Sequence, residues 1–436
     1  MASSFPFHIK EHAIPGQHIR EWPRALAHSQ EDALQIHIKQ YIPHDNPSPQ
    51  PGDVTFIGAH ANGFPKELYE ALWTELHSVA RSHGFRIRSI WIADVSNQGR
   101  SGVLNEELLG HDTCWHDHAR DLLHMVNIFR DDMPRPLVGV GHSFGGNVLT
   151  HLSLLHPRLF STLVLLDPVI VKFSLARVGP GNSPTRGSTF RRETWPNRSE
   201  AAAAFRRSPF YSAWDPRVLD AWVTHALRDT PTPLFPDTSA GDVTLSTTKH
   251  QEVFTFFRPL WPHVRPDGSV DKDAQAGAPD FDVDQAALVD PINPFPFYRG
   301  EGPSVLRHLP EVRPSVLWVF GGTSDLSTPE LRQIKMSTTG IGQGGSGGAA
   351  AGRVAEIVME GMGHLFPMEV PAQVAKHLGS WVGTEMVRWR QQEAEYVAWT
   401  RKPMHEKNTL SQEFVDKVTS SIGGAPRSKA KKDAKL

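Results

Sequence analysis

The sequence predicts an α/β protein built on a mostly parallel central sheet that is flanked by helices. Short apolar runs, such as residues 54–58, 137–140 and 316–320, alternate with longer segments whose apolar residues follow helical spacing. This alternation is typical of parallel strands that are buried on both faces. It stops between Pro168 and Pro314, so we expect an inserted cap, or lid, above the sheet.

Each element follows from a local pattern. Residues 7–42 alternate apolar and polar side chains around a Pro15-Gly16 turn, which predicts two antiparallel edge strands. Further strands are expected at 54–58, 87–93, 137–140, 161–167, 316–322 and 354–358, and helices at 66–79, 115–129 and 371–400. The chain then divides into a core at 1–168, a cap at 169–313, a second core part with a long helix at 314–402, and a flexible basic tail at 403–436.

The composition excludes several classes of protein. Of the 436 residues, 39% are hydrophobic and the formal net charge is −2, as expected for a globular protein with no overall attraction to nucleic acid. The lone cysteine, Cys114, rules out an intramolecular disulfide and fits a reducing compartment. The N-terminus lacks the apolar core of a signal peptide, and no stretch reaches the ~18 apolar residues of a membrane span.

The sequence Gly141-His142-Ser143-Phe144-Gly145-Gly146 carries the strongest chemical signal. It follows the apolar run 137–140 and precedes a segment with helical spacing, so strand, Gly-x-Ser-x-Gly and helix occur in the order of a nucleophile elbow. Such a turn is so tight that glycine is needed where strand and helix approach. We therefore expect Ser143 to lie at the end of a strand as the nucleophile of a serine hydrolase.

A serine nucleophile needs a base and a carboxylate that orients this base. His364 follows the last predicted core strand and is the candidate base. Two aspartates qualify as the acid, because Asp325 follows the penultimate strand and Asp167 ends the strand after the elbow helix. Both lie at carboxyl ends of core strands, where ligands gather in open α/β sheets, so position alone leaves the choice open.

The candidate oxyanion-hole donors are the backbone N–H groups of Phe144, which follows the nucleophile, and Asn62, in the loop after an early strand. No P-loop motif is present. The sequence His116-Asp117-His118 resembles part of a metal-ligand set, but it lies at a polar helix start and we interpret it as a solvated face. We expect neither a cofactor nor a metal.

Taken together, these residues resemble those of the α/β-hydrolase superfamily over residues 7–400, which implies the α/β-hydrolase fold. More narrowly, the chain resembles the fungal peroxisomal acyl-CoA hydrolases of secondary metabolism, of the kind found in mycophenolic acid and toxin biosynthesis. The matching stretches are 17–21, 63–70, 117–123, 133–139 and 361–365. The resemblance implies a serine esterase or acyl-CoA thioesterase. It maps the acid of the catalytic triad onto Asp167, whereas Asp325 departs from the family pattern.

The C-terminal Ala434-Lys435-Leu436 is a conservative variant of the Ser-Lys-Leu peroxisomal address. Together with the resemblance, it predicts a peroxisomal matrix enzyme whose tripeptide binds the peroxisomal import receptor. The expected small-molecule partner is an acyl-CoA or ester substrate. We expect no nucleic-acid partner and no membrane span, and the sequence leaves a homodimer open.

The first part of the predicted cap is strongly basic. Residues 172–217 hold nine Lys and Arg residues and three Asp and Glu residues, and nine minus three gives +6 in a chain whose total is −2. One interpretation is a solvated run of charges that pairs with acids elsewhere. The other is that Arg191 and Arg192 contact the phosphates of a coenzyme A substrate.

The function predicted from these features is hydrolysis of an acyl-CoA thioester, or a related ester, through an acyl-enzyme on Ser143. An alternative is a carboxylester, lipid or lactone hydrolase with the same triad. A more distant alternative is a ligand-binding protein that keeps the fold without turnover, since a fold alone does not fix a function. The sequence pattern does not identify the acyl group, because cap residues shape that pocket.

Overall fold

The computed structural model describes residues 5–172, 184–258, 265, 267, 271 and 299–422. The chain divides into two compact units, Met1–Met386 and Val387–Leu436. The predicted targeting tripeptide, Ala434 to Leu436, lies outside the described residues. None of the helices in the described part of the chain combines the length and the apolar character that a membrane crossing requires.

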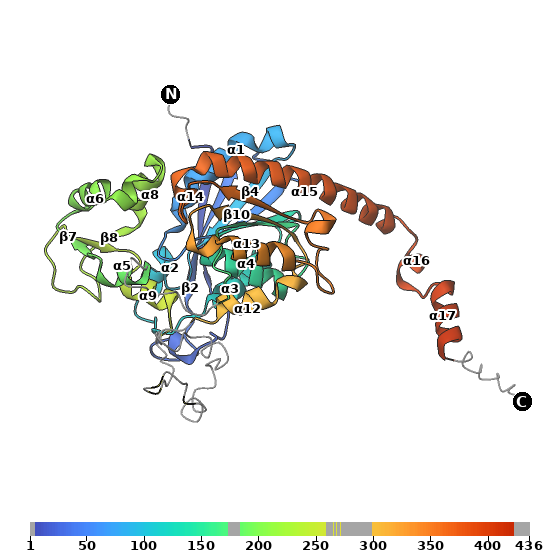
Figure 1. Cartoon of the computed structure of the whole chain (residues 1–436), viewed down its shortest axis with the longest axis horizontal. Coiled ribbons are helices and arrows are strands. Elements are labelled where there is room, and N and C mark those ends of the chain that lie inside the picture. Colours follow the sequence, from blue (N-terminus) through green and yellow to red (C-terminus); the bar gives the residue numbers. More distant parts are fainter. Residues whose placement is uncertain are drawn as a thin grey trace, which may run out of the picture. The chain divides into compact units, whose positions relative to one another are not determined.

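An eight-stranded sheet forms the centre of the first unit (Figure 1). The first two strands run antiparallel to their neighbours, and the remaining six are parallel. The predicted fold class is therefore confirmed. In spatial order the strands are β1 (Phe7–Pro15), β2 (Gln35–Pro43), β4 (Ile87–Ala93), β3 (Val54–Ala59), β5 (Leu137–His142), β6 (Thr162–Leu166), β10 (Ser315–Gly321) and β11 (Val354–Met359).

The apolar runs that predicted these strands are buried, since every residue of β3, β5, β6 and β10 is inaccessible to solvent or nearly so. Helices cover both faces of the sheet (Figure 1). On one face lie α1 (Glu70–Ala80) and the part of α15 (Pro371–Thr400) that belongs to the first unit, and Trp381 of α15 donates to Thr162 Oγ1 of β6. On the other face, α3 (Trp115–Ile128), α4 (Phe144–Leu155) and α12 (Glu301–Arg307) join the main apolar core.

Short elements connect these layers, and most of them lie in loops at the ends of the strands. They are η1 (Pro23–Ala25), η2 (Lys66–Tyr69), η3 (Arg81–His83), α2 (Gly99–Asn105), η4 (Leu309–Glu311), η5 (Asp325–Ser327), α13 (Pro329–Thr338), η6 (Ala349–Ala351) and α14 (Phe366–Glu369).

Several short helices and strands between β6 and β10 lie at the left of Figure 1, within the range expected to form the cap. The sequence pattern did not predict a small antiparallel sheet of order β7-β9-β8, because each of its strands has only two or three residues. The described cap elements are α5 (Pro184–Phe190), β7 (Thr194–Trp195), α6 (Arg198–Arg207), α7 (Pro209–Ser212), α8 (Pro216–His225), β8 (Leu227–Asp229), β9 (Val243–Leu245) and α9 (Lys249–Phe256).

The second unit includes the tail expected at 403–436, of which residues 403–422 are described. It contains the end of α15 and two further helices, α16 (Met404–Asn408) and α17 (Gln412–Ile422). A physical reason for helix formation is visible in α17, where Phe414, Val415 and Val418 recur at helical spacing and form one apolar side.

Candidate active site

Ser143 occupies a tight turn between β5 and α4. Its φ of 60° is in the left-handed region. A residue with a side chain adopts this conformation at a cost of about 1–3 kcal/mol, and keeps it only where the surrounding structure enforces it. The enforcing contacts are close, since a Cβ on Gly145 would lie 2.3 Å from the Ala59 carbonyl oxygen and one on Gly141 would lie 2.6 Å from that of Gly145. The glycines of the motif therefore let strand and helix approach closely enough to project Ser143 from the edge of the sheet.

Three of the predicted side chains form a continuous hydrogen-bonded array. The distance from His364 Nε2 to Ser143 Oγ is 2.9 Å, and the distance from His364 Nδ1 to Asp167 Oδ2 is 2.7 Å. Ser143 follows β5, Asp167 follows β6, and His364 lies in the loop after β11, so the array gathers at the carboxyl ends of parallel strands. The Asp167 carboxylate is fully buried, whereas the His364 side chain is 31% exposed.

The Asp167 carboxylate has further hydrogen-bond donors. Its Oδ1 accepts from the Gly321 N–H at 3.1 Å and from the Ser327 hydroxyl, and its Oδ2 also accepts from Ser324 Oγ at 2.5 Å. Burial by itself would raise the pKa of this carboxyl group, but His364 and the two serine hydroxyls outweigh burial and lower it to about 2. Asp167 therefore remains an anion at neutral pH.

Asp325 takes no part in this array. It is exposed at the start of η5, and it is Asp167 that bonds His364. The loop that the sequence singled out for its aspartate instead supplies Ser324 and Ser327, which hold Asp167. Sequence reasoning missed these two hydroxyls. The available signal was a pair of serines three positions apart in the loop after β10, the strand that pairs with β6.

The two proposed oxyanion donors come from different segments, the start of helix α4 and the loop after β3. Phe144 is the first residue of α4, so its N–H has no partner within the helix and is free to bind an anion. Asn62 lies in the loop after β3, where Gln98 holds the turn: it accepts from the Gly63 N–H at 2.7 Å and donates to Asn62 Oδ1 at 2.8 Å. Gly63, with a φ of 76°, gives this loop its sharp bend.

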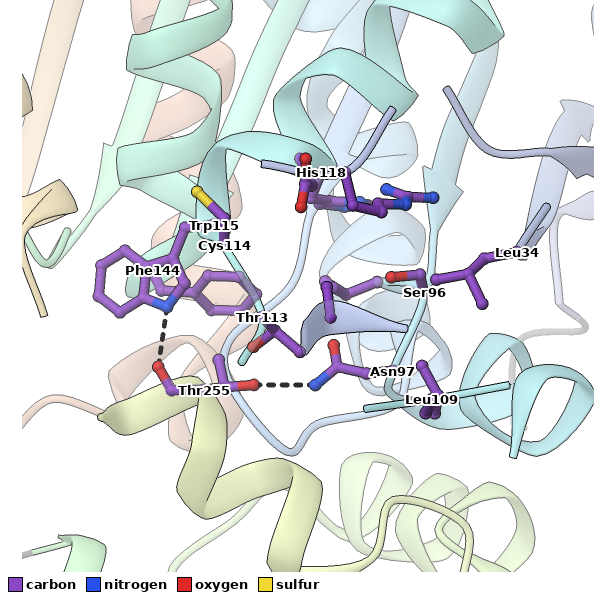
Figure 2. Close-up of a pocket in the computed structure, with 14 residues that line it drawn as sticks. Leu34, Ser96, Asn97, Leu109, Thr113, Cys114, Trp115, His118, Phe144 and Thr255 are labelled. Atoms are coloured by element: carbon purple, nitrogen blue, oxygen red, sulfur yellow. Dashed lines mark hydrogen bonds between the residues drawn. The ribbon is translucent and has the colours of Figure 1, made fainter. Parts of the chain in front are cut away.

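Helix α9 of the cap is anchored to the core close to Phe144. Figure 2 shows a small cavity where the Trp115 indole donates to the Thr255 carbonyl oxygen (2.8 Å) and the Asn97 amide donates to Thr255 Oγ1 (3.1 Å). Glu252, one turn earlier in α9, accepts from the Asn62 side-chain amide through its backbone carbonyl (3.0 Å). The cap therefore contacts the loop at residues 60–64, which carries the proposed donor Asn62 and is called the oxyanion loop below.

The two arginines predicted to contact substrate differ in their surroundings. Arg191 Nη1 lies 2.9 Å from the buried carboxylate of Glu252, which also accepts from Ser188 at 2.6 Å. Arg191 thus fits the interpretation in which the basic residues pair with acids. Arg192 is exposed, with its guanidinium 5.5 Å from the centre of the Trp195 ring and its Nε–H donated to the Thr194 carbonyl oxygen.

The interpretation of His116-Asp117-His118 as a solvated face is wrong, because Asp117 and His118 face the protein interior and are 4% and 1% exposed. The His116 ring stacks on His151 at 3.6 Å, Asp117 accepts from Arg120 at 2.8 Å, and His118 is buried. Among the residues that the structure describes, no group of three or more His, Cys, Asp or Glu side chains is placed to hold a metal ion.

The sequence matches the alpha/beta hydrolase family over residues 56–377. The chain therefore belongs to the α/β-hydrolase family and is an enzyme of the hydrolase class. This agrees with the fold and with the resemblance drawn from the sequence.

Two curated relatives extend the match over nearly the whole chain. The type I acyl-CoA thioesterase mpaH of Penicillium roqueforti (strain FM164) is 42% identical over 413 residues, which cover 90% of this chain and 92% of the relative. The type I acyl-CoA thioesterase mpaH' of Penicillium brevicompactum is 44% identical over the same shares. Among solved structures, the peroxisomal alpha-beta-hydrolase Lpx1 from Saccharomyces cerevisiae matches this chain with a TM-score of 0.65 at 17% sequence identity. The match covers 96% of this chain and 98% of Lpx1, and it shows that the two proteins share a fold.

The geometry predicts a clear ranking of the two aspartates. Replacing Asp167→Asn should lower kcat on the order of 10³–10⁴-fold, because an amide cannot hold His364 in the tautomer that accepts a proton from Ser143. Asp325→Asn should keep most of the activity, since Asp325 is exposed and outside the array. Steady-state kinetics on both folded variants measure the difference, and the reverse order would show that Asp325 is the acid.

Proposed function

We propose that this protein is a serine hydrolase that cleaves an acyl-CoA thioester through an acyl-enzyme intermediate. The observation that carries the chemistry is the hydrogen-bonded array of Ser143, His364 and Asp167 at the carboxyl ends of the strands. The choice of thioester is supported by the two relatives named as acyl-CoA thioesterases, which align over 90% of the chain. By the same likeness, we place the reaction in fungal secondary metabolism.

In the first half of the reaction, Ser143 Oγ attacks the acyl carbonyl carbon while His364 Nε2 takes the serine proton. The carbonyl oxygen becomes an oxyanion, which the N–H groups of Phe144 and Asn62 stabilise. Collapse of this intermediate breaks the carbon–sulfur bond, and His364 returns the proton to the departing thiolate. Each oxyanion donor contributes about 10²–10³ in rate in enzymes of this type.

In the second half, His364 takes a proton from the water that attacks the acyl carbon of the acyl-enzyme. The bond between this carbon and Ser143 Oγ then breaks, His364 returns the proton to Ser143 Oγ, and the carboxylic acid leaves. Each time His364 becomes cationic, the Asp167 anion lies 2.7 Å from its Nδ1 and stabilises the positive charge. The four hydrogen-bond donors of Asp167 also keep its carboxylate from rotating, so the His364 ring stays oriented with Nε2 toward Ser143 Oγ. A simple ester would undergo the same steps, which makes a carboxylester, lipid or lactone hydrolase the alternative.

Hydrolysis should depend on the array as a unit. Ser143→Ala and His364→Ala should each lower kcat by at least about a thousandfold while the fold is retained, because triad members act together. A screen of acyl-CoA thioesters against matched simple esters should show higher kcat/KM for the thioesters. Fluorophosphonate labelling of the wild type, with Ser143→Ala as control, tests the nucleophile independently of substrate.

More than a few per cent of activity in folded Ser143→Ala would contradict the serine mechanism. A consistent preference for simple esters would instead select the carboxylester alternative.

The exposed cation Arg192 provides a test of coenzyme A recognition. Arg191 ties this segment to Glu252 beside the oxyanion loop, so its neighbour Arg192 is a solvent-facing charge near the active site. Arg192→Glu should raise KM for acyl-CoA several-fold, and increasingly so at low salt, but leave a neutral p-nitrophenyl ester unaffected. Arg158→Glu is the matched control, because Arg158 is exposed in the loop between α4 and β6, at the opposite end of the strands from Ser143. Equal effects on both substrates would remove Arg192 from coenzyme A binding.

We further propose that the protein acts in the peroxisomal matrix and binds the import receptor through Ala434-Lys435-Leu436. A fluorescent fusion that leaves this tripeptide at the free C-terminus should form peroxisomal puncta. Deletion of the tripeptide should make the fusion cytosolic, and puncta that survive the deletion would show that another signal is responsible.

A further inference from the structure

Two fully buried polar side chains adjoin the array without belonging to it. Tyr69 ends η2, which follows the oxyanion loop, and is 2% exposed. His142 ends β5, directly before Ser143, and is 0% exposed. Burying a polar group costs free energy unless the group is hydrogen-bonded. The hydrogen-bond partners of Tyr69 and His142 therefore show which parts of the site these two side chains hold in place.

Those partners form one chain of hydrogen bonds. The Ala61 N–H donates to Tyr69 Oη at 2.9 Å, Tyr69 Oη lies 2.8 Å from His142 Nδ1, and His142 Nε2 lies 3.1 Å from the His364 carbonyl oxygen. Ala61 precedes Asn62 in the oxyanion loop. This chain of hydrogen bonds thus starts beside Asn62, a proposed oxyanion donor. It passes through His142, which precedes Ser143, and ends at the backbone carbonyl of His364.

The proton positions follow from what each group can donate. The Ala61 N–H can only donate, so Tyr69 Oη accepts there and has its own hydrogen for His142 Nδ1. His142 must then carry its hydrogen on Nε2, which is the one that faces the His364 carbonyl oxygen. Burial raises the pKa of the Tyr69 phenol, and burial, with the nearby His364, lowers the pKa of His142 to about 3, so both groups remain neutral and keep this pattern.

We propose that Tyr69 and His142 are positioning residues, which fix the Asn62 N–H and His364 relative to Ser143 through this hydrogen-bond chain. The inference rests on the proposed serine mechanism. The hydrogen-bond chain joins the loops after three different strands, β3, β5 and β11, and so adds a second link to the array of Ser143, His364 and Asp167. Because neither side chain reaches the substrate, loss of the chain should weaken transition-state stabilisation and leave substrate binding nearly unchanged.

The main test is Tyr69→Phe, which keeps the ring and removes the shared oxygen. It should lower kcat by about tenfold or more with little change in KM, because small displacements of reacting groups are costly. The matched control is Tyr41→Phe, since Tyr41 is equally buried and its hydroxyl donates to Glu70 at 2.9 Å within the first unit but outside the hydrogen-bond chain. Thermal unfolding should show comparable losses of stability for both variants, with kcat lowered only by Tyr69→Phe.

Two variants of His142 separate positioning from packing. His142→Phe should lower kcat at least as far as Tyr69→Phe, whereas His142→Gln, whose side-chain amide can still donate to the His364 carbonyl oxygen, should recover most of the loss. The double variant Tyr69→Phe with His142→Phe should be no worse than His142→Phe alone, because the two residues act through one chain.

Tyr69→Phe with the kcat of Tyr41→Phe, or single losses that multiply in the double variant, would overturn the proposal. Ser143→Ala, assayed alongside, distinguishes the two levels of inference. An inactive Ser143→Ala with a fully active Tyr69→Phe contradicts the hydrogen-bond chain alone, and an active Ser143→Ala contradicts the serine mechanism itself.

Discussion

The fully buried carboxylate of Asp167 imposes the strictest local requirement on this structure. A buried charge that loses its partners destabilises a protein by about 3–5 kcal/mol, so its donors must all be in place. They come from the end of β10 at Gly321, from Ser324 and Ser327 in the turn that follows, and from His364 beyond β11. Strand pairing, loop conformation and the base of the proposed triad are therefore coupled through one side chain.

Much of this arrangement could be predicted from the sequence because it depends on local patterns. Apolar runs gave the parallel strands, since a strand buried on both faces has few polar positions. The elbow at Ser143 was predictable because glycines at fixed spacing are required where a side chain would collide with the neighbouring backbone. His364 was predictable as a residue in the loop after the last core strand. In each case the determining contacts lie within a few residues of the motif.

What could not be predicted depends on contacts between distant segments. Asp167 and Asp325 both follow core strands, so their positions left the acid open and only the family resemblance favoured Asp167, the residue that bonds His364 in the structure. The cap was predicted as an insertion, but its small sheet has strands too short to leave a periodic pattern. Likewise, nothing in the sequence around Tyr69 indicates that its hydroxyl joins Ala61 to His142.

Ser143 and Asp167 are the two residues other than glycine with positive φ in the described part of the chain. Main-chain hydrogen bonds link these bends to adjacent strands: the Ser143 N–H bonds the Leu166 carbonyl oxygen, and the Asp167 N–H bonds that of Val319. A slip of one residue between neighbouring strands would turn side chains to the opposite face. The geometry that joins Ser143 to Asp167 therefore depends on the final strand register, and a chain with slipped strands would not bring these two residues together.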